Sequence, residues 1–117
     1  INYANQYYRD PSLYPYVRDR FLPQPNVKVI QGIVPDVLLQ ESPNKIAFMH
    51  IDLNSPAAEI GALELLFERM SPGAVLVFDD YGWKQFHKQK EVEDKFMAAL
   101  GYNILELPTG QGLVIKR

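Results

Sequence analysis

Two adjacent carboxylates, Asp79 and Asp80, directly follow an apolar run in the stretch AVLVFDDYGW. A third carboxylate, Asp52, closes another apolar run, KIAFMHI. Like charges this close disfavour joint ionisation, so carboxylates at the end of a buried strand need a compensating partner. A ligand set made only of oxygens suits a hard cation such as Mg²⁺ or Mn²⁺. A plain turn without a metal is the alternative, because Asp is common in turns and helix caps.

The two histidines of the chain have open roles. His50 lies two residues before Asp52, so the two side chains share one face of a strand. It could act as a general base, fix the geometry of the site, or simply be hydrogen-bonded within the strand end. His87 lies in the basic segment KQFHKQK, near the start of a predicted helix. It could act as a base or contact a substrate, although a solvated helix face accounts for it better.

Two aromatic residues, Tyr81 and Trp83, follow the acidic pair. They could form the wall of an acceptor pocket, although aromatic residues just after a strand more often pack on the next helix. Further along, the segment PTGQG contains Gly110 and Gly112, which permit positive φ. We interpret this segment as a hairpin turn.

The elements that would position these residues alternate between strands and helices. Strands are predicted at 27–31, 45–53, 74–78, 102–108 and 112–117, and helices at 15–21, 33–42, 55–70 and 88–100. This order predicts an α/β fold with parallel strands, helices on both faces of the sheet and a terminal antiparallel hairpin.

The clearest helix is SPAAEIGALELLFERM. Ser55 or Asn54 can cap it, Pro56 suits its first turn, and Glu59 lies near the positive end of the helix dipole. The SPG that follows is predicted to stop the helix before the next strand.

Ligands of parallel sheets bind beyond the carboxyl ends of the strands. Strands joined by one right-handed crossover are often neighbours, about 4.8 Å apart. Asp52, Asp79 and Asp80 would then lie on one rim of the sheet, which strengthens the cation hypothesis.

The composition restricts the class of protein. A length of 117 residues suits one small domain, and 47% apolar residues can form a core. A net charge of −2 with dispersed basic residues gives no electrostatic case for nucleic acid. The lack of cysteine suits a reducing cytoplasm. No apolar run approaches the roughly 20 residues that a membrane helix needs.

The segment HIDLNSPAAEIGALELLFERMSPGAVLVFDDYGW, continued by LPTGQGLVIK, resembles the class I S-adenosylmethionine-dependent methyltransferases of the macrocin O-methyltransferase type. The combination of HID, a proline-initiated helix, SPG, DDYG and PTGQG carries the resemblance, which covers at least residues 26–117. It implies the carboxyl-terminal half of a Rossmann-like methyltransferase fold. The chain would then be a single partial domain, with an amino-terminal segment at 1–25 and strands three to seven of the fold at 26–117.

The resemblance also implies a reaction and a metal. Mg²⁺ would be held by Asp52, Asp79 and Asp80, and the methyl group would pass from S-adenosylmethionine to a hydroxyl of a small molecule, such as a sugar or natural product. The metal would bind two neighbouring acceptor oxygens, lower the pKa of one and hold it in line. The similar catechol O-methyltransferases have a lysine where this chain has Ser55, so that role does not carry over.

The family holds its cofactor through a glycine-rich loop and an acidic residue, and neither has a counterpart in this sequence. Gln31 and Gly32, at the end of the first predicted strand, are the candidate cofactor contacts. The start INYANQYYRD lacks an initiator methionine, and we expect it to lie inside a longer protein. Missing elements would leave a sheet edge and apolar surface uncovered, so we expect a homo-oligomer or dependence on the missing part.

Two other hypotheses compete with the enzyme. The chain could be a non-catalytic, partner-dependent module without a cofactor pocket. It could also be a receiver-like phosphoacceptor domain, since these domains gather three aspartates on one rim. In receivers, however, the acidic pair follows the first strand, whereas here it comes late in the chain.

Overall fold

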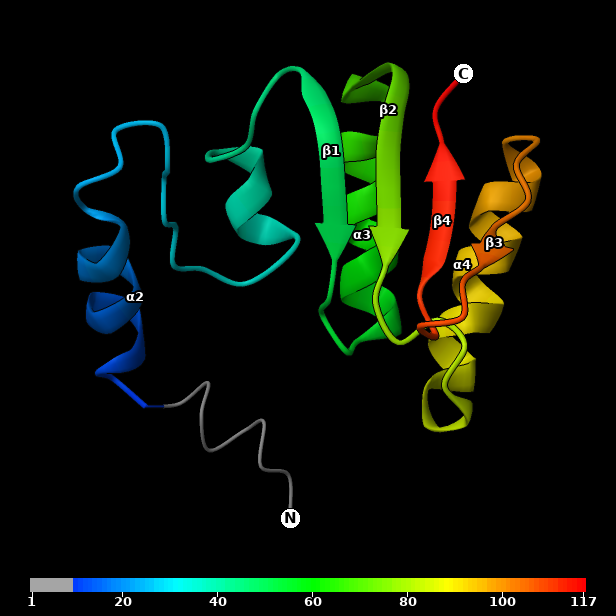
Figure 1. Cartoon of the computed structure of the whole chain (residues 1–117), viewed down its shortest axis with the longest axis horizontal. Coiled ribbons are helices and arrows are strands. Elements are labelled where there is room, and N and C mark those ends of the chain that lie inside the picture. Colours follow the sequence, from blue (N-terminus) through cyan, green and yellow to red (C-terminus); the bar gives the residue numbers. More distant parts are fainter. Residues whose placement is uncertain (1–9) are drawn as a thin grey trace. The chain divides into compact units, whose positions relative to one another are not determined.

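The computed structural model describes residues 10–117 and divides the chain into two compact units, one ending at Gly32 and the other spanning Ile33–Arg117. The described part of the first unit contains helix α2, Leu13–Phe21 (Figure 1). This confirms the helix predicted at 15–21. None of the residues of α2 is buried.

The prediction of a strand at 27–31 is wrong. This segment has no regular secondary structure, and Val27 and Ile30 are each 40% exposed. Alternating β-branched residues favour a strand only where a neighbouring strand can pair with the backbone. The segment has no such partner in the structure, so the local pattern alone does not produce a strand.

The second unit is built on a four-stranded sheet with the order β1-β2-β4-β3 (Figure 1). The strands are β1 (Ile46–Ile51), β2 (Met70–Phe78), β3 (Leu105–Glu106) and β4 (Gly112–Ile115). β1 and β2 are parallel, whereas β4 is antiparallel to both β2 and β3. The predicted α/β class with parallel strands and a terminal antiparallel hairpin is confirmed.

Helices α3 (Pro56–Leu66) and α4 (His87–Ala99) pack against each other and lie behind the sheet in Figure 1. Between them and the sheet lies the apolar core, formed mainly by Met49, Ile51, Leu63, Leu66, Leu76, Phe78, Met97 and Val114. The predicted helices at 55–70 and 88–100 are therefore present, although α3 is shorter than expected.

The other face of the sheet is not covered by helices of this unit. In β1, Met49 and Ile51 are buried, whereas Phe48 is 62% exposed and His50 is also exposed. In the unit Ile33–Arg117, helices therefore cover one face of the sheet only, whereas the sequence predicts helices on both faces. The run KIAFMHI is apolar at nearly every position, so its composition could not distinguish the covered face from the open one.

The start of α3 follows the sequence closely. The hydroxyl of Ser55 accepts a hydrogen bond from the Ala58 backbone nitrogen at 3.4 Å, and Pro56 is the first helical residue. The end of the helix differs from the prediction: α3 stops at Leu66, a 3₁₀ turn (η2, Phe67–Arg69) follows, and β2 begins at once.

The SPG segment lies inside β2 instead of forming a separate stop. Gly73 has φ of +87°, a conformation that favours glycine, and the pairing of β1 with β2 shifts register between Ile46 and Phe48. The predicted helix at 33–42 is also shortened, to the 3₁₀ helix η1, Asp36–Leu39. In the part of the chain that the structure describes, no helix is both long and apolar enough to span a membrane.

Candidate metal centre

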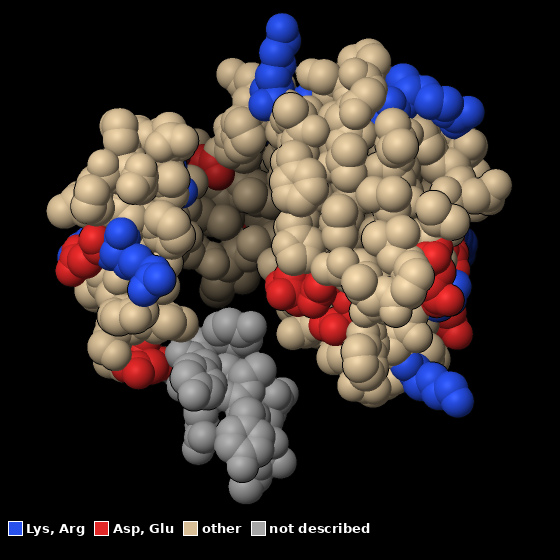
Figure 2. All heavy atoms as spheres, in the orientation of Figure 1, with Lys and Arg blue, Asp and Glu red and all other residues tan. Residues whose placement is uncertain are grey.

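The three predicted carboxylates meet at the carboxyl ends of β1 and β2. Because Ile51 pairs with Phe78 in the parallel ladder, the residues that follow these strands emerge side by side. One carboxylate oxygen each from Asp52, Asp79 and Asp80 lies within 4.8 Å of the others. Figure 2 shows acidic side chains gathered at this end of the sheet.

An unusual backbone conformation brings the two adjacent aspartates together. Successive side chains of a regular strand point to opposite faces, which would separate Asp79 from Asp80. Asp80, however, has φ of +56°, in the left-handed region where few non-glycine residues lie. The turn ends the alternation at this residue, so both carboxylates can reach the same point.

The three carboxylates of this cluster carry like charges, which repel one another. Burial raises the pKa of Asp52 and of Asp80, and the negative charge of Asp79 raises both further. A divalent cation would remove this repulsion and would find three oxygen ligands already close together. The donor set therefore fits a hard cation of the Mg²⁺ type.

His50 is placed beside the cluster. Its Nε2 atom lies 3.5 Å from Asp79 Oδ1, and the side chain is 42% exposed. The residue is on the open face of the sheet, so it can meet a molecule bound there. Its geometry is compatible both with orienting Asp79 and with accepting a proton, and the two roles are separated by experiment below.

Gln111 is a site residue that the sequence did not reveal. Its Nε2 atom donates a hydrogen bond to Asp79 Oδ1 at 3.0 Å. The segment PTGQG forms the predicted turn, with Gly110 at φ of +85°, but it also returns to the carboxyl end of β2. Only the position of β4 next to β2 brings it there, and no local motif carries that signal.

Tyr81 anchors the segment that follows the acidic pair. It is 3% exposed, and its hydroxyl donates to Asp94 on α4 and accepts from Lys90 Nζ at 3.1 Å. The pKa of Tyr81 is raised by burial and then by Asp94, which favours the hydroxyl form that donates. Tyr81 therefore packs against the next helix, α4, which was the alternative to a place in the wall of an acceptor pocket.

Trp83 is 51% exposed and packs on the terminal hairpin. A Cβ atom added to Gly110 would lie 2.4 Å from its indole nitrogen, so this close approach requires glycine. A role for Trp83 toward an acceptor stays a prediction. The same holds for Gln31 and Gly32 as cofactor contacts, which belong to the first unit.

His87 is the first residue of α4. Its Nδ1 atom is 3.2 Å from the Lys84 backbone oxygen, and the side chain is exposed. With Asn54 and Phe86 it lines a cavity of about 350 Å³.

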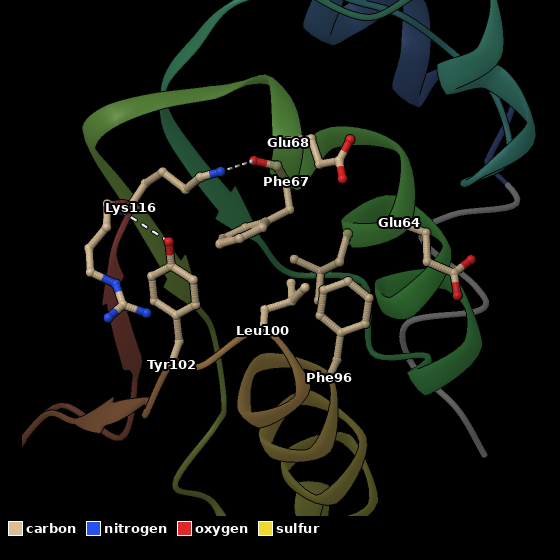
Figure 3. Close-up of a pocket in the computed structure, with 9 residues that line it drawn as sticks. Glu64, Phe67, Glu68, Phe96, Leu100, Tyr102 and Lys116 are labelled. Carbon is tan, nitrogen blue, oxygen red and sulfur yellow. Dashed lines mark hydrogen bonds between the residues drawn. The ribbon is translucent and has the colours of Figure 1, made fainter.

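A cavity of about 230 Å³ lies beside the three carboxylates, and His50 and Asp52 line it together with mainly apolar side chains. A larger cavity of about 400 Å³ lies at the opposite end of the sheet (Figure 3). There Phe67 packs edge-on against Tyr102, and Lys116 Nζ donates to the Phe67 backbone oxygen at 3.4 Å. The two basic side chains of this cavity, Lys116 and Arg117, lie over the rings of Phe67 and Tyr102 and are engaged in packing.

Comparison with known proteins supports one family. The family model of the macrocin-O-methyltransferase (TylF) matches residues 16–102. The fold is similar to that of the O-methyltransferase NovP, with a TM-score of 0.74 and 16% identity over 92% of this chain. The chain covers 44% of the NovP chain, less than half of its length. None of the curated proteins matches the sequence. Because the matched family model spans well over half of the sequence, the chain belongs to the macrocin O-methyltransferase family.

Proposed function

We propose that this chain supplies the metal-binding part of an S-adenosylmethionine-dependent O-methyltransferase that acts on a hydroxyl group of a small molecule, such as a sugar or a natural product. The observation that carries the proposal is the cluster of Asp52, Asp79 and Asp80, whose carboxylate oxygens lie within 4.8 Å of one another. Family membership supports methyl transfer as the reaction.

Three carboxylates would hold Mg²⁺ in this proposal. The bound ion would supply Lewis acidity, which lowers the pKa of a coordinated hydroxyl and holds it in place. The protein's own residues prepare the site: Gln111 donates to Asp79 and restricts its orientation, and His50 lies 3.5 Å from the same carboxylate. His50 Nε2, if unprotonated, is also placed to accept the proton that the acceptor hydroxyl loses.

S-adenosylmethionine, the proposed cofactor, would supply an electrophilic methyl group. Its contacts in this chain are proposed to include Gln31 and Gly32. Because the chain covers less than half of NovP, the methyl-transfer activity is proposed for the complete enzyme. The chain by itself is proposed to bind the cation.

A second function is favoured by one observation, the uncovered face of the sheet. Phe48, Leu105 and Ile115 lie on it and are 57–62% exposed. An apolar surface of this kind marks an interaction site. The alternative is therefore a non-catalytic module that depends on a partner.

Titration of the 117-residue chain with Mn²⁺, followed by calorimetry or by electron paramagnetic resonance, tests the metal site. We expect Asp80→Asn to weaken Mn²⁺ binding by about tenfold or more, because one of three charged ligands is lost. Glu91→Gln removes one negative charge from an exposed position of α4 and serves as the matched control. Equal binding by the Asp80→Asn variant and the unmodified chain would reject the proposed site.

A further inference from the structure

The loop that follows Asp52 is held by side chains buried below it. Gln89 on α4 is 5% exposed. One end of its side-chain amide lies 3.2 Å from the backbone nitrogen of Asn54 and 3.1 Å from that of Ser55. Both nitrogens are hydrogen-bond donors, so this end of the amide is the oxygen, which accepts from both.

Glu59 on α3, only 1% exposed, completes this support. Its carboxyl group accepts a hydrogen bond from the backbone amide of Leu53. Its Oε1 atom lies 3.3 Å from the same end of the Gln89 amide, so Glu59 carries a proton there and donates it to the Gln89 oxygen. Three successive backbone amides after Asp52 are therefore bound by side chains of α3 and α4.

The conformation of the loop explains why such support is needed. Asn54 has φ of +54°, in the left-handed region. Asparagine adopts this conformation more readily than most residues, but it is uncommon and depends here on the surroundings of the loop. The buried acceptors supply that constraint two residues after a predicted metal ligand.

A fully buried acid lies behind Glu59. Glu93 is 0% exposed and is hydrogen-bonded to Glu59. If both groups were ionised, Glu59 Oε2 and both carboxyl oxygens of Glu93 would have no donor. A second proton, on Glu93, removes the repulsion and supplies a donor toward Glu59. Burial, and then the neighbouring Glu59, raise the pKa of Glu93 in agreement with this arrangement.

We propose that Gln89 and Glu59 are positioning residues of the metal centre, which hold the backbone of residues 53–55 and thereby set Asp52 at the correct distance from Asp79 and Asp80. This inference rests on the proposed cation site. Nothing in the sequence pattern of α3 or α4 indicates it, because both residues occupy positions that also suit a solvated helix face.

Gln89→Met keeps the length of the side chain and removes its hydrogen-bonding groups. We expect this variant of the 117-residue chain to bind Mn²⁺ about tenfold more weakly, as is typical when support behind a metal ligand is lost. Met97→Leu is the control, since Met97 is an equally buried residue of α4 and lies in the apolar core. Its Mn²⁺ affinity should be unchanged.

Glu59 provides a second pair of variants. Glu59→Gln keeps a donor toward Gln89 and an acceptor for Leu53, so its Mn²⁺ affinity should stay within about threefold, whereas Glu59→Leu should lose about tenfold. Hydrogen exchange of the metal-free variants should show faster exchange at residues 53–55 in Gln89→Met, with the core amides of β2 still protected.

The outcomes separate the two proposals. If the unmodified chain does not bind Mn²⁺, the proposed metal site and the positioning role both fail. If the unmodified chain binds Mn²⁺ and folded Gln89→Met and Glu59→Leu variants bind it equally well, only the positioning role is rejected. If Gln89→Met does not fold, the comparison of Glu59→Gln with Glu59→Leu decides the question.

Discussion

Gln111 Nε2 donates a hydrogen bond to Asp79 Oδ1 at 3.0 Å, and this contact ties the terminal hairpin to the carboxyl end of β2. The two residues are 32 positions apart. The side chain of Gln111 is oriented in turn by Thr109, whose hydroxyl donates to its Oε1 atom at 3.1 Å. The hairpin therefore takes part in shaping the candidate metal centre.

Replacing Gln111 should weaken metal binding. Gln111→Met removes the donor that orients Asp79, and we expect Mn²⁺ affinity of the chain to fall about threefold to tenfold. Thr109→Ser, which keeps the hydroxyl that contacts Gln111, is the control and should change affinity by less than about twofold. Loss of affinity in the control alone would show that the hairpin turn, and not the hydrogen bond to Asp79, is what matters.

His50 should be important for the reaction and unimportant for metal binding. His50→Gln keeps a nitrogen that can donate to Asp79 but cannot act as a base at neutral pH. In the complete enzyme we expect the methyl-transfer rate to fall about a hundredfold or more, with Mn²⁺ affinity nearly unchanged. A rate close to that of the unmodified enzyme would instead assign His50 to fixing the geometry of Asp79.

Stability should fall with rising pH because of Glu93. Its pKa in the folded state is raised above the usual value of 4.5, so above that pH the folded chain keeps a proton that the unfolded chain releases. The free energy of unfolding then decreases as pH rises toward the raised pKa, by up to about 1.4 kcal/mol per pH unit for one proton.

Glu93→Gln removes this titration. We expect the variant to lose less stability than the unmodified chain between about pH 6 and about pH 8 in urea unfolding experiments. Glu64→Gln, at an exposed position of α3, is the control and should follow the unmodified chain. Parallel stability curves for Glu93→Gln and the unmodified chain would mean that Glu93 is ionised in the folded state.

The open face of the sheet should cause the 117-residue chain to self-associate. Phe48, Val75 and Ile115 are neighbours across β1, β2 and β4, and two of them are more than half exposed. Burying such apolar surface between two copies is favourable at about 25 cal/mol per Å². We expect dimers or larger species in light scattering at micromolar concentration.

Phe48→Lys with Ile115→Lys should convert these species to monomers, because two charges would enter the contact. Leu100→Lys places a charge on an equally apolar, 47% exposed residue elsewhere and is the control. A monomeric unmodified chain would contradict the proposed association.

The sequence by itself determined which carboxylates meet at the candidate metal centre. The positions of Asp52, Asp79 and Asp80 at the ends of apolar runs were sufficient to predict their convergence, because parallel strands joined by one helix carry their carboxyl ends to the same rim. The cap at Ser55 and the terminal hairpin followed from local residue types in the same way. These features depend on short-range patterns, which a sequence displays directly.

The tertiary structure decided which residues support that site. Gln111 reaches Asp79 because β4 lies next to β2, and Gln89 lies next to Glu59, 30 residues away, because α3 and α4 pack on one face of the sheet. That packing also leaves Phe48 exposed, and 27–31 pairs with no strand among residues 10–117. Such contacts depend on which helices and strands become neighbours. Hydrophobic periodicity indicates the type of each element but not the element against which it packs.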